Sequence, residues 1–359
     1  MPESVPIRAD VVWPPLLIRP PRPPVLVYLD LNHFINLAKV AIGKTAPPGY
    51  AELLTAARDA VTSGRATFPL SATHLMEVSD IGKAKQRADV ANVMAELSGF
   101  NYLLGRPLII ELEIEASLSL LVGQDLTTVG PVDLVAYGGL WAFGMWSKVT
   151  FSDAQGNDTT DQVRAALGPA AFDDMVAEAN REAQMIMLNG GDSGYPQGTW
   201  REKLDARAKR EVGQMAAIDT NPSYRDDQLR NVINAAEAYH ELNEYLEAGV
   251  DRSGLDPLEL FPTPEGARSF SDGLPSVRVA VSLKTHYHKN RQHNWTTNDV
   301  HDIDALAVAM AYCDAVFADK AMRNALLSSP ELNLFGTELP RTPVQLADWL
   351  KQLPAWANG

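Results

Sequence analysis

The chain of 359 residues is long enough to bury a large core and to form two lobes. Its apolar residues (46%) and charged residues (21%) occur in the proportions of a folded globular protein, and its formal net charge of -14 argues against a protein that coats nucleic acid through a basic surface. The single cysteine, Cys313, excludes an intrachain disulfide and a four-cysteine zinc site, and we expect it in the core.

The beginning of the chain has no basic and apolar leader, and no apolar run of about 18 residues is present to span a bilayer. We therefore expect a cytoplasmic protein without a membrane partner. Residues 1–24 contain the stretch WPPLLIRPPRPP, whose prolines favour extended polyproline geometry. This proline-rich stretch is predicted to be an arm that is packed on the surface or loose, and a ligand for a proline-binding module is the alternative.

Residues 25–125 alternate between strand and helix patterns. An apolar run predicts a strand over Val25–Asp30, and a shorter strand is predicted over 66–71, where Pro69 indicates irregular pairing. Helical periodicity, in several cases closed by a glycine, predicts helices over 34–43, 51–64, 72–82, 84–99 and 107–123.

Residues 126–276 have a different character, because glycine-rich pieces alternate with charged helical runs such as 199–215 and 228–249. We predict that they form a mainly helical insertion. The strand–helix alternation resumes in 277–359, and such alternation implies an α/β fold with a parallel sheet flanked by helices. In this part a buried strand is predicted over 315–319 and helices over 276–290, 302–314, 320–329 and 342–353.

Four acidic residues fall where a parallel sheet binds ligands, at or near the carboxyl ends of strands. Asp30 ends the first strand, and Asp319 ends the strand at 315–319. Glu77 lies on the helix after the second strand, and Asp302 opens the helix that precedes Asp319. Clustered carboxylates repel one another unless cations neutralise them, and ligands that are all oxygen suit Mg2+ or Mn2+ rather than zinc.

Each acid also has a simpler interpretation. The two strand-end aspartates are suited to capping the helices that follow them, Glu77 to a solvated helix face, and Asp302 to a favourable interaction with the helix dipole. Asp299 and Asp304 are alternatives to Asp302. Asp299 also suits a helix cap, and helical geometry turns Asp304 toward another face.

The stretches VYLDLNHFINLAK, FPLSATHLMEVSD and NDVHDIDALAVAMAYCDAVFADKAMRNAL resemble PIN-like ribonuclease domains, over about 25–125 and 277–350. The piece YCDAVFADK is similar to the YCD-x-x-x-x-D end of some bacterial PIN-like proteins. The resemblance implies a PIN-like parallel sheet and Mg2+- or Mn2+-dependent cleavage of RNA. The order of the family's acids falls on Asp30, Glu77, Asp302 and Asp319, as catalytic and metal-binding residues. The chain departs from small PIN toxins in its length and in the insertion, which leave substrate and regulation open.

A basic and aromatic loop, KTHYHKNRQHNW at 284–295, directly precedes the Asp302 helix. We predict that its Lys284, Lys289 and Arg291 contact RNA phosphates. A solvated segment and a zinc site made from its three histidines are the alternatives.

Two further polar residues are predicted close to the acids. Asn32 is placed to donate to a phosphate or to orient a metal-bound water, and Ser71 is placed to touch the site. Both residues also suit helix capping.

The predicted function is metal-dependent endoribonuclease. The non-enzyme alternative is a PIN-like scaffold that binds RNA or protein through its insertion, and a homo-oligomer or a protein partner on the insertion is also considered. A haloacid-dehalogenase-like phosphatase also begins on a strand-end aspartate, but its chemistry needs a second aspartate two residues later, where this chain has Asn32.

Overall fold

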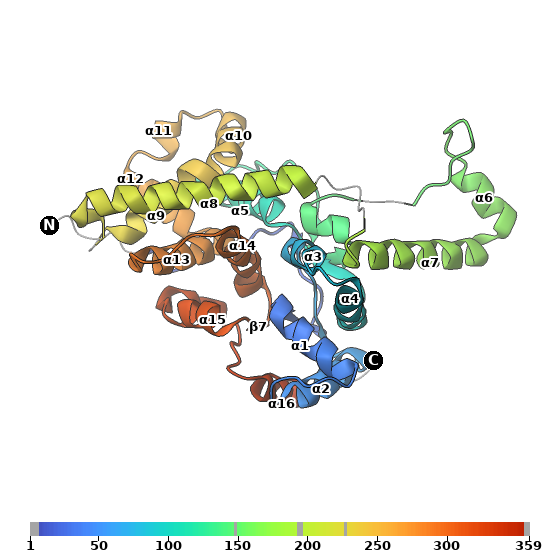
Figure 1. Ribbon diagram of the computed structural model, residues 1–359. Coiled ribbons are helices and arrows are strands. Elements are labelled where there is room, and N and C mark those ends of the chain that lie inside the picture. The colour runs from blue at the N-terminus through green and yellow to red at the C-terminus, as the bar shows by residue number, and fades with distance from the viewer. Residues whose placement is uncertain (1–6, 147–148, 192–196, 226–227, 355–359) are drawn as a thin grey trace.

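The computed structural model describes residues 7–146, 149–191, 197–225 and 228–354 (Figure 1). The described chain is mixed α/β, as predicted, with a small parallel sheet surrounded by helices. The sheet has the strand order β3–β2–β7, and both pairs are parallel. The strands are β1 (Leu17–Ile18), β2 (Val25–Leu29), β3 (Ala66–Thr67), β4 (Asn101–Leu103), β5 (Val132–Asp133), β6 (Val135–Tyr137) and β7 (Ala315–Phe317).

Helices occupy most of the rest of the chain. Those before residue 126 are α1 (Leu31–Ala41), α2 (Tyr50–Thr62), α3 (Ala72–Ser79), α4 (Ala84–Ser98) and α5 (Arg106–Val122). Those within 126–276 are η1 (Gly139–Phe143), α6 (Thr160–Leu167), α7 (Pro169–Leu188), α8 (Gln197–Thr220), η2 (Pro222–Tyr224), α9 (Leu229–Glu237), the π-helix η3 (Ala238–Leu242), α10 (Asn243–Ser253), α11 (Pro257–Leu260) and α12 (Pro264–Asp272). The last are α13 (Pro275–Lys289), α14 (Thr297–Tyr312), α15 (Lys320–Leu327), η4 (Pro330–Phe335) and α16 (Pro343–Gln352).

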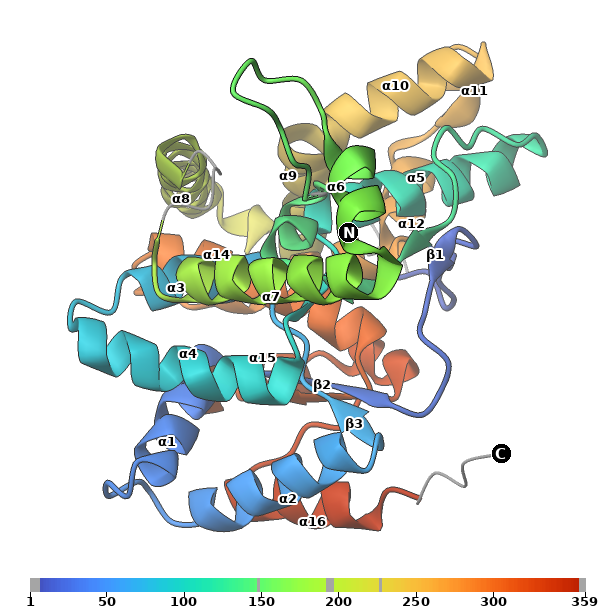
Figure 2. The ribbon, with the colours of Figure 1, turned by 90° about the vertical axis from the view of Figure 1, so that its right-hand side faces the viewer.

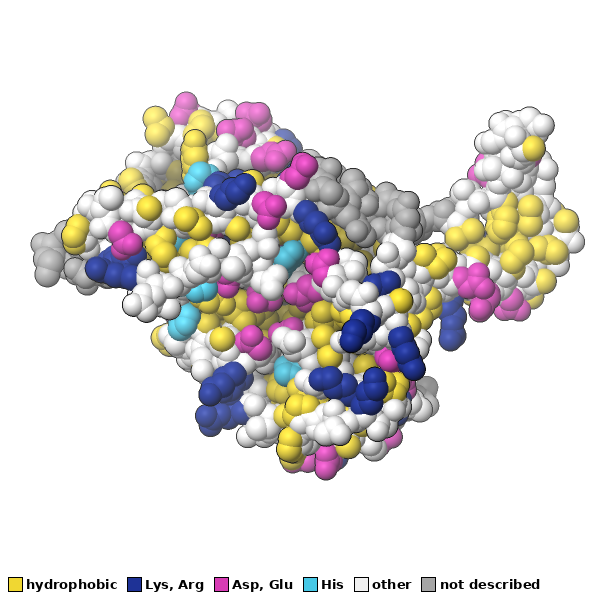
Figure 3. Space-filling model, in the orientation of Figure 1, with side chains coloured by type: hydrophobic (Ala, Val, Ile, Leu, Met, Phe, Trp, Pro, Cys, Tyr) yellow, Lys and Arg dark blue, Asp and Glu magenta, His cyan; other side chains and the backbone are white. Residues whose placement is uncertain are grey.

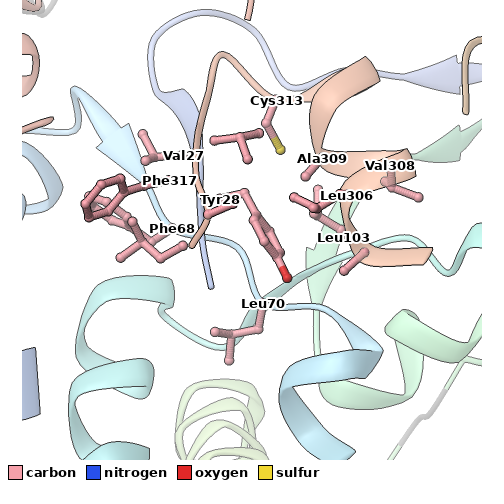
Figure 4. Close-up of a cluster of buried hydrophobic side chains, with 14 of the residues drawn as sticks. Val27, Tyr28, Phe68, Leu70, Leu103, Leu306, Val308, Ala309, Cys313 and Phe317 are labelled. Atoms are coloured by element: carbon pink, nitrogen blue, oxygen red, sulfur yellow. The ribbon is translucent and has the colours of Figure 1, made fainter. Parts of the chain in front are cut away.

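The central strand β2 is buried on both faces, which explains its nearly continuous apolar sequence. Figure 4 shows side chains of β2, β7 and α14 meeting in one cluster, with Val27, Phe317 and Leu306 among them. The alanines of α14 let this helix lie close to the sheet, and Ala307 and Ala309 are fully buried. On the other side, α2 and α16 lie side by side beneath β3 (Figure 2).

The predicted second strand is much shorter than expected. Only Ala66 and Thr67 pair with β2, because the chain turns away before Pro69, and Leu70 forms an isolated bridge with Tyr102. Strand β4, which the sequence analysis did not predict, contains that tyrosine.

The described part of the proline-rich arm packs on the body of the molecule. Trp13 contacts the rings of Tyr312 and Phe335 edge-on, and Arg19 donates to the carbonyl oxygens of Ala311 and Tyr312 at 3.1 Å. Within the arm, β1 pairs with β5 of the 126–276 segment, and β6 of the same segment pairs with β4. Residues 1–6 lie outside the described residues.

Most of 126–276 is helical, and its helices lie in two different places in the molecule. Helices α8 to α12 lie over α5, α13 and α14, whereas α6 and the start of α7 extend away from the body (Figure 1). The end of α7 returns to pack against α3 and α4.

Candidate functional site

Two of the predicted acids follow neighbouring strands. In the parallel pair formed by β2 and β7, Leu29 lies opposite Phe317. Asp30 comes directly after β2, and Asp319 comes two residues after β7. The Asp30 amide also donates to the Phe317 carbonyl oxygen at 3.1 Å. The strand pairing therefore brings both aspartates to the same edge of the sheet.

Both aspartates cap the helices that follow them. An Asp30 carboxylate oxygen accepts from the Asn32 amide at 3.3 Å, and an Asp319 oxygen accepts from the Met322 amide at 2.8 Å. The capping interpretation is thus correct for both residues. It leaves the site open, because an ionised carboxyl group has about four lone-pair positions and each cap uses one.

The other two acids come from helices that contact each other. Glu77 lies on α3 and Asp302 on α14, and both side chains are mostly buried. The Thr73 hydroxyl donates to the His301 carbonyl oxygen at 3.4 Å, which joins the two helices near the acids.

The pKa values of these carboxyl groups indicate that they share one environment. Burial raises the pKa of Glu77 to about 8, and the charge of Asp30 adds to the shift. Burial also raises the pKa of Asp302 to about 8, with contributions from Asp30, Glu77 and Asp319. The pKa of Asp30 is raised by burial and by Asp319. Glu77 and Asp302 therefore carry protons at neutral pH, and a cation that bound them would have to displace those protons.

Within the residues that the structure describes, no group of three or more His, Cys, Asp or Glu side chains is positioned to hold a metal ion. The four carboxyl groups thus influence one another electrostatically without forming a ready-made coordination shell. Their donor atoms are all carboxylate oxygens, the type that Mg2+ and Mn2+ prefer. Asp30, Glu77, Asp302 and Asp319 fit such an ion by chemistry, and binding would require their side chains to draw together.

A buried histidine that the sequence analysis missed holds this edge of the sheet. The Ser71 amide donates to His74 Nδ1 at 3.0 Å, so Nε2 carries the hydrogen and donates to the Leu29 carbonyl oxygen at 2.7 Å. Burial lowers the pKa of His74 to about 4, so the ring stays neutral. Ser71 and His74 form a capping box for α3 and connect that helix to the end of β2, immediately before Asp30. The sequence signal for this contact was Ser71, at the end of the predicted second strand, because serine is a common helix cap.

The predicted supporting residues take separate positions. Asn32 is exposed in the first turn of α1, with its backbone amide bonded to Asp30. Asp299 forms a capping box with Thr296, whose amide donates to an Asp299 oxygen at 2.7 Å. Asp299 is therefore the N-terminal cap partner of α14, and it lies close enough to Asp302 to contribute to the raised pKa of that residue.

Asp304 lies in a different environment from Asp302. Its carboxylate is 2.7 Å from Arg106 and 2.5 Å from Arg207. Burial acts against ionisation of Asp304, but Arg207 and Arg106 outweigh it and hold the pKa well below the usual range. The two arginines belong to a buried charge network that joins α14 to α5, α8, α9 and α13. Its members include Arg106, Arg207, Glu211, Glu237, Glu241, Lys284 and Asp304.

The prediction for Lys284 was wrong. Lys284 lies within the predicted helix, but on a part of α13 that is buried, and it is only 5% exposed. Its ammonium group is 2.7 Å from Glu211 and 2.6 Å from Glu237. These two carboxylates hold Lys284 inside the protein, away from any phosphate. Lys289 and Arg291 are exposed, and their role stays a prediction.

The histidines of this segment face different partners. His288 Nε2 lies 2.8 Å from Glu211, and His293 Nε2 lies 3.4 Å from Asp299. His286 shares a hydrogen bond with Ser328. The alternative of a zinc site from these residues gains no support.

Comparisons with known proteins add no family and no relative to these observations. No family model matches the chain, and neither the curated proteins nor the solved structures contain a match. Among the helices in the described residues, none combines the length and the apolar character needed to cross a membrane.

Proposed function

We propose that the protein is a PIN-like, metal-dependent endoribonuclease. The observation that carries the proposal is the parallel pairing of β2 with β7, which brings Asp30 and Asp319 to one edge of the sheet. The raised pKa values of Glu77 and Asp302 support it, because they indicate two more carboxyl groups within electrostatic reach of that edge.

In this proposal Asp30, Glu77, Asp302 and Asp319 hold one or two divalent ions. Bound Mg2+ or Mn2+ supplies the charge neutralisation and water activation that hydrolysis of a phosphodiester bond requires. The protein contributes the carboxylate ligands and their positions. The caps on α1 and α15 fix Asp30 and Asp319, and the contact between His74 and the Leu29 carbonyl oxygen fixes α3 against β2.

The second candidate is a PIN-like scaffold that binds RNA or protein without cutting. It is favoured by one observation, that no group of three or more metal-ligand side chains is preassembled in the described residues. The two candidates differ in whether a divalent ion and hydrolysis are part of the function.

Cleavage of end-labelled RNA tests the proposal. The wild type should cut with Mg2+ or Mn2+ and stop in EDTA, and Asp302→Asn should lose roughly 100-fold or more of the rate, as expected when a group that stabilises the transition state is removed. Asp348→Asn is the matched control, because Asp348 is an exposed aspartate on α16, and it should cut like the wild type. No cutting by the wild type with either ion would favour the scaffold. Equal cutting by Asp302→Asn and the wild type would instead remove Asp302 from the proposed active site.

A further inference from the structure

A groove lies between the C-terminal part of α1 and the N-terminal part of α4, with a volume of about 540 Å³. Its rim is basic and its floor is apolar, so it combines charge with a surface that excludes water. The rim includes Lys39, Lys44, Lys83 and Lys85, and the floor includes Ile42 and Val90.

The lysines of this groove are not neutralised by the protein. Lys39 donates to the Asn36 side-chain oxygen at 3.0 Å, and none of the four forms an ion pair with a residue that the structure describes. Asp89 also lines the groove, which leaves an excess of positive charge. In a chain with a net charge of -14, such a local excess is a specific feature of this face.

Helix α1 connects the groove to the acidic site. Asp30 caps the beginning of α1, and Lys39 lies in its last turn. At a rise of 1.5 Å per residue, the two are about 14 Å apart along the helix. Figure 3 shows acidic side chains gathered in the middle of this face and Lys and Arg side chains over α1 and α4 beside them.

We infer that this groove, and not the Lys284 segment, binds the phosphate backbone of the RNA strand whose scissile bond lies at the carboxylates. The inference rests on the proposed function. Phosphates match the lysine rim, because an unpaired ammonium group gains most from a strong anion. The aliphatic floor offers an apolar surface to the bases, and Ile42 is 41% exposed there.

The test measures binding separately from cleavage. The background is Asp30→Asn in EDTA, which cannot cut, and the probe is a fluorescent oligouridine of about 20 nucleotides at several salt concentrations. In the groove variant, Lys44, Lys83 and Lys85 are replaced by glutamine. The slope of log affinity against log salt should fall by about 0.7 per lost contact, hence by about 2 in total. A matched variant with Lys203, Lys209 and Lys351 replaced by glutamine changes the net charge equally and should keep the slope, since these exposed lysines lie outside the groove.

Three results for the salt slope overturn the inference. They are an unchanged slope in the groove variant, an equal fall in the matched variant, and a fall only when Lys289 and Arg291 are replaced. Equal displacement of the RNA by polyglutamate of matched length would also overturn it, in favour of an acidic peptide. Metal-dependent cleavage with an unchanged groove slope would remove this inference and keep the proposed function. A reduced salt slope in the groove variant, together with no cleavage by the wild type, would keep RNA binding by the groove and remove the proposed function.

Discussion

Glu77 and Asp302, the two candidate site acids that lie on helices, are protonated or ionised at neutral pH according to their raised pKa values. In the folded protein the pKa values of Glu77 and Asp302 are raised to about 8, mainly by burial, whereas in the unfolded chain both groups ionise near pH 4 to 5. Between these values the unfolded chain binds fewer protons than the folded protein. These two groups therefore lower the free energy of unfolding as the pH rises from about 4 to about 8, and their penalty is complete above that range.

Asp302→Asn should remove part of this penalty. In EDTA at about pH 8, we expect the variant to be more stable than the wild type by on the order of 2 kcal/mol, because the asparagine cannot ionise in a mostly buried position. At about pH 4, where the folded protein keeps Asp302 protonated and the unfolded chain is only partly ionised, the difference should be small. Urea unfolding at both pH values measures this, with Asp348→Asn as the exposed control. A difference that does not depend on pH would contradict the raised pKa of Asp302.

Asp304→Asn should have the opposite effect, although it changes a residue only two positions away. The substitution leaves Arg106 and Arg207 with one carboxylate fewer in a buried network, and the loss of one partner from such a network costs about 3 kcal/mol. We expect the stability to decrease at every pH where Asp304 is ionised. Thermal unfolding checks this. A folded, fully stable Asp304→Asn that no longer cuts RNA would mean that Asp304, and not Asp302, belongs to the active site.

At the scale of elements, α13 was predicted as a helix over 276–290, but its burial was not predicted. All its residues from Pro275 to Thr285 are buried, including the polar Arg278 and Lys284. The polar residues of this stretch gave no sign of that burial. Lys284 is held inside by Glu211 and Glu237, and these partners come from distant helices whose packing no local pattern specifies.

Lys284→Met should therefore destabilise the protein. Burial acts against ionisation of Glu211, but the Lys284 ammonium outweighs it and lowers the pKa of Glu211 to about 2. Without that ammonium, Glu211 and Glu237 each lose one of their two partners inside the protein, which costs about 3–5 kcal/mol. Lys289→Met, on the same helix but exposed, should change the stability by less than about 0.5 kcal/mol. Equal effects of the two substitutions in urea unfolding would contradict the buried network.

Much of the element order could be predicted from the sequence, because strands and helices near the sheet have strong local patterns. The strand before Asp30 and the strand before Asp319 were both predicted, and only their pairing had to come from the fold. Short strands such as β4 and β5 have two or three residues and no periodicity to detect. The link from His74 to the Leu29 carbonyl oxygen was equally hidden, because a buried histidine has no fixed spacing from its partner.

At the scale of the whole molecule, the charges are arranged in separate regions. Carboxyl groups lie at the edge of the sheet. The buried charge network joins α5, which precedes the 126–276 segment, to helices within that segment and after it. Lysines without an ion pair in the described residues line the groove between α1 and α4. The net charge of -14 would repel RNA in general, so the proposed RNA binding requires this local excess of positive charge.

The central claim is that Asp30, Glu77, Asp302 and Asp319 together bind a divalent cation. Calorimetric titration with Mn2+ tests it most directly, in two buffers with different ionisation enthalpies. Because Glu77 and Asp302 are protonated at about pH 7, binding should release between one and two protons there and almost none at about pH 9, with higher affinity at the higher pH. Asp302→Asn should weaken binding and release fewer protons. Binding that releases no protons at about pH 7, or that is equally tight in Asp302→Asn, would contradict the claim.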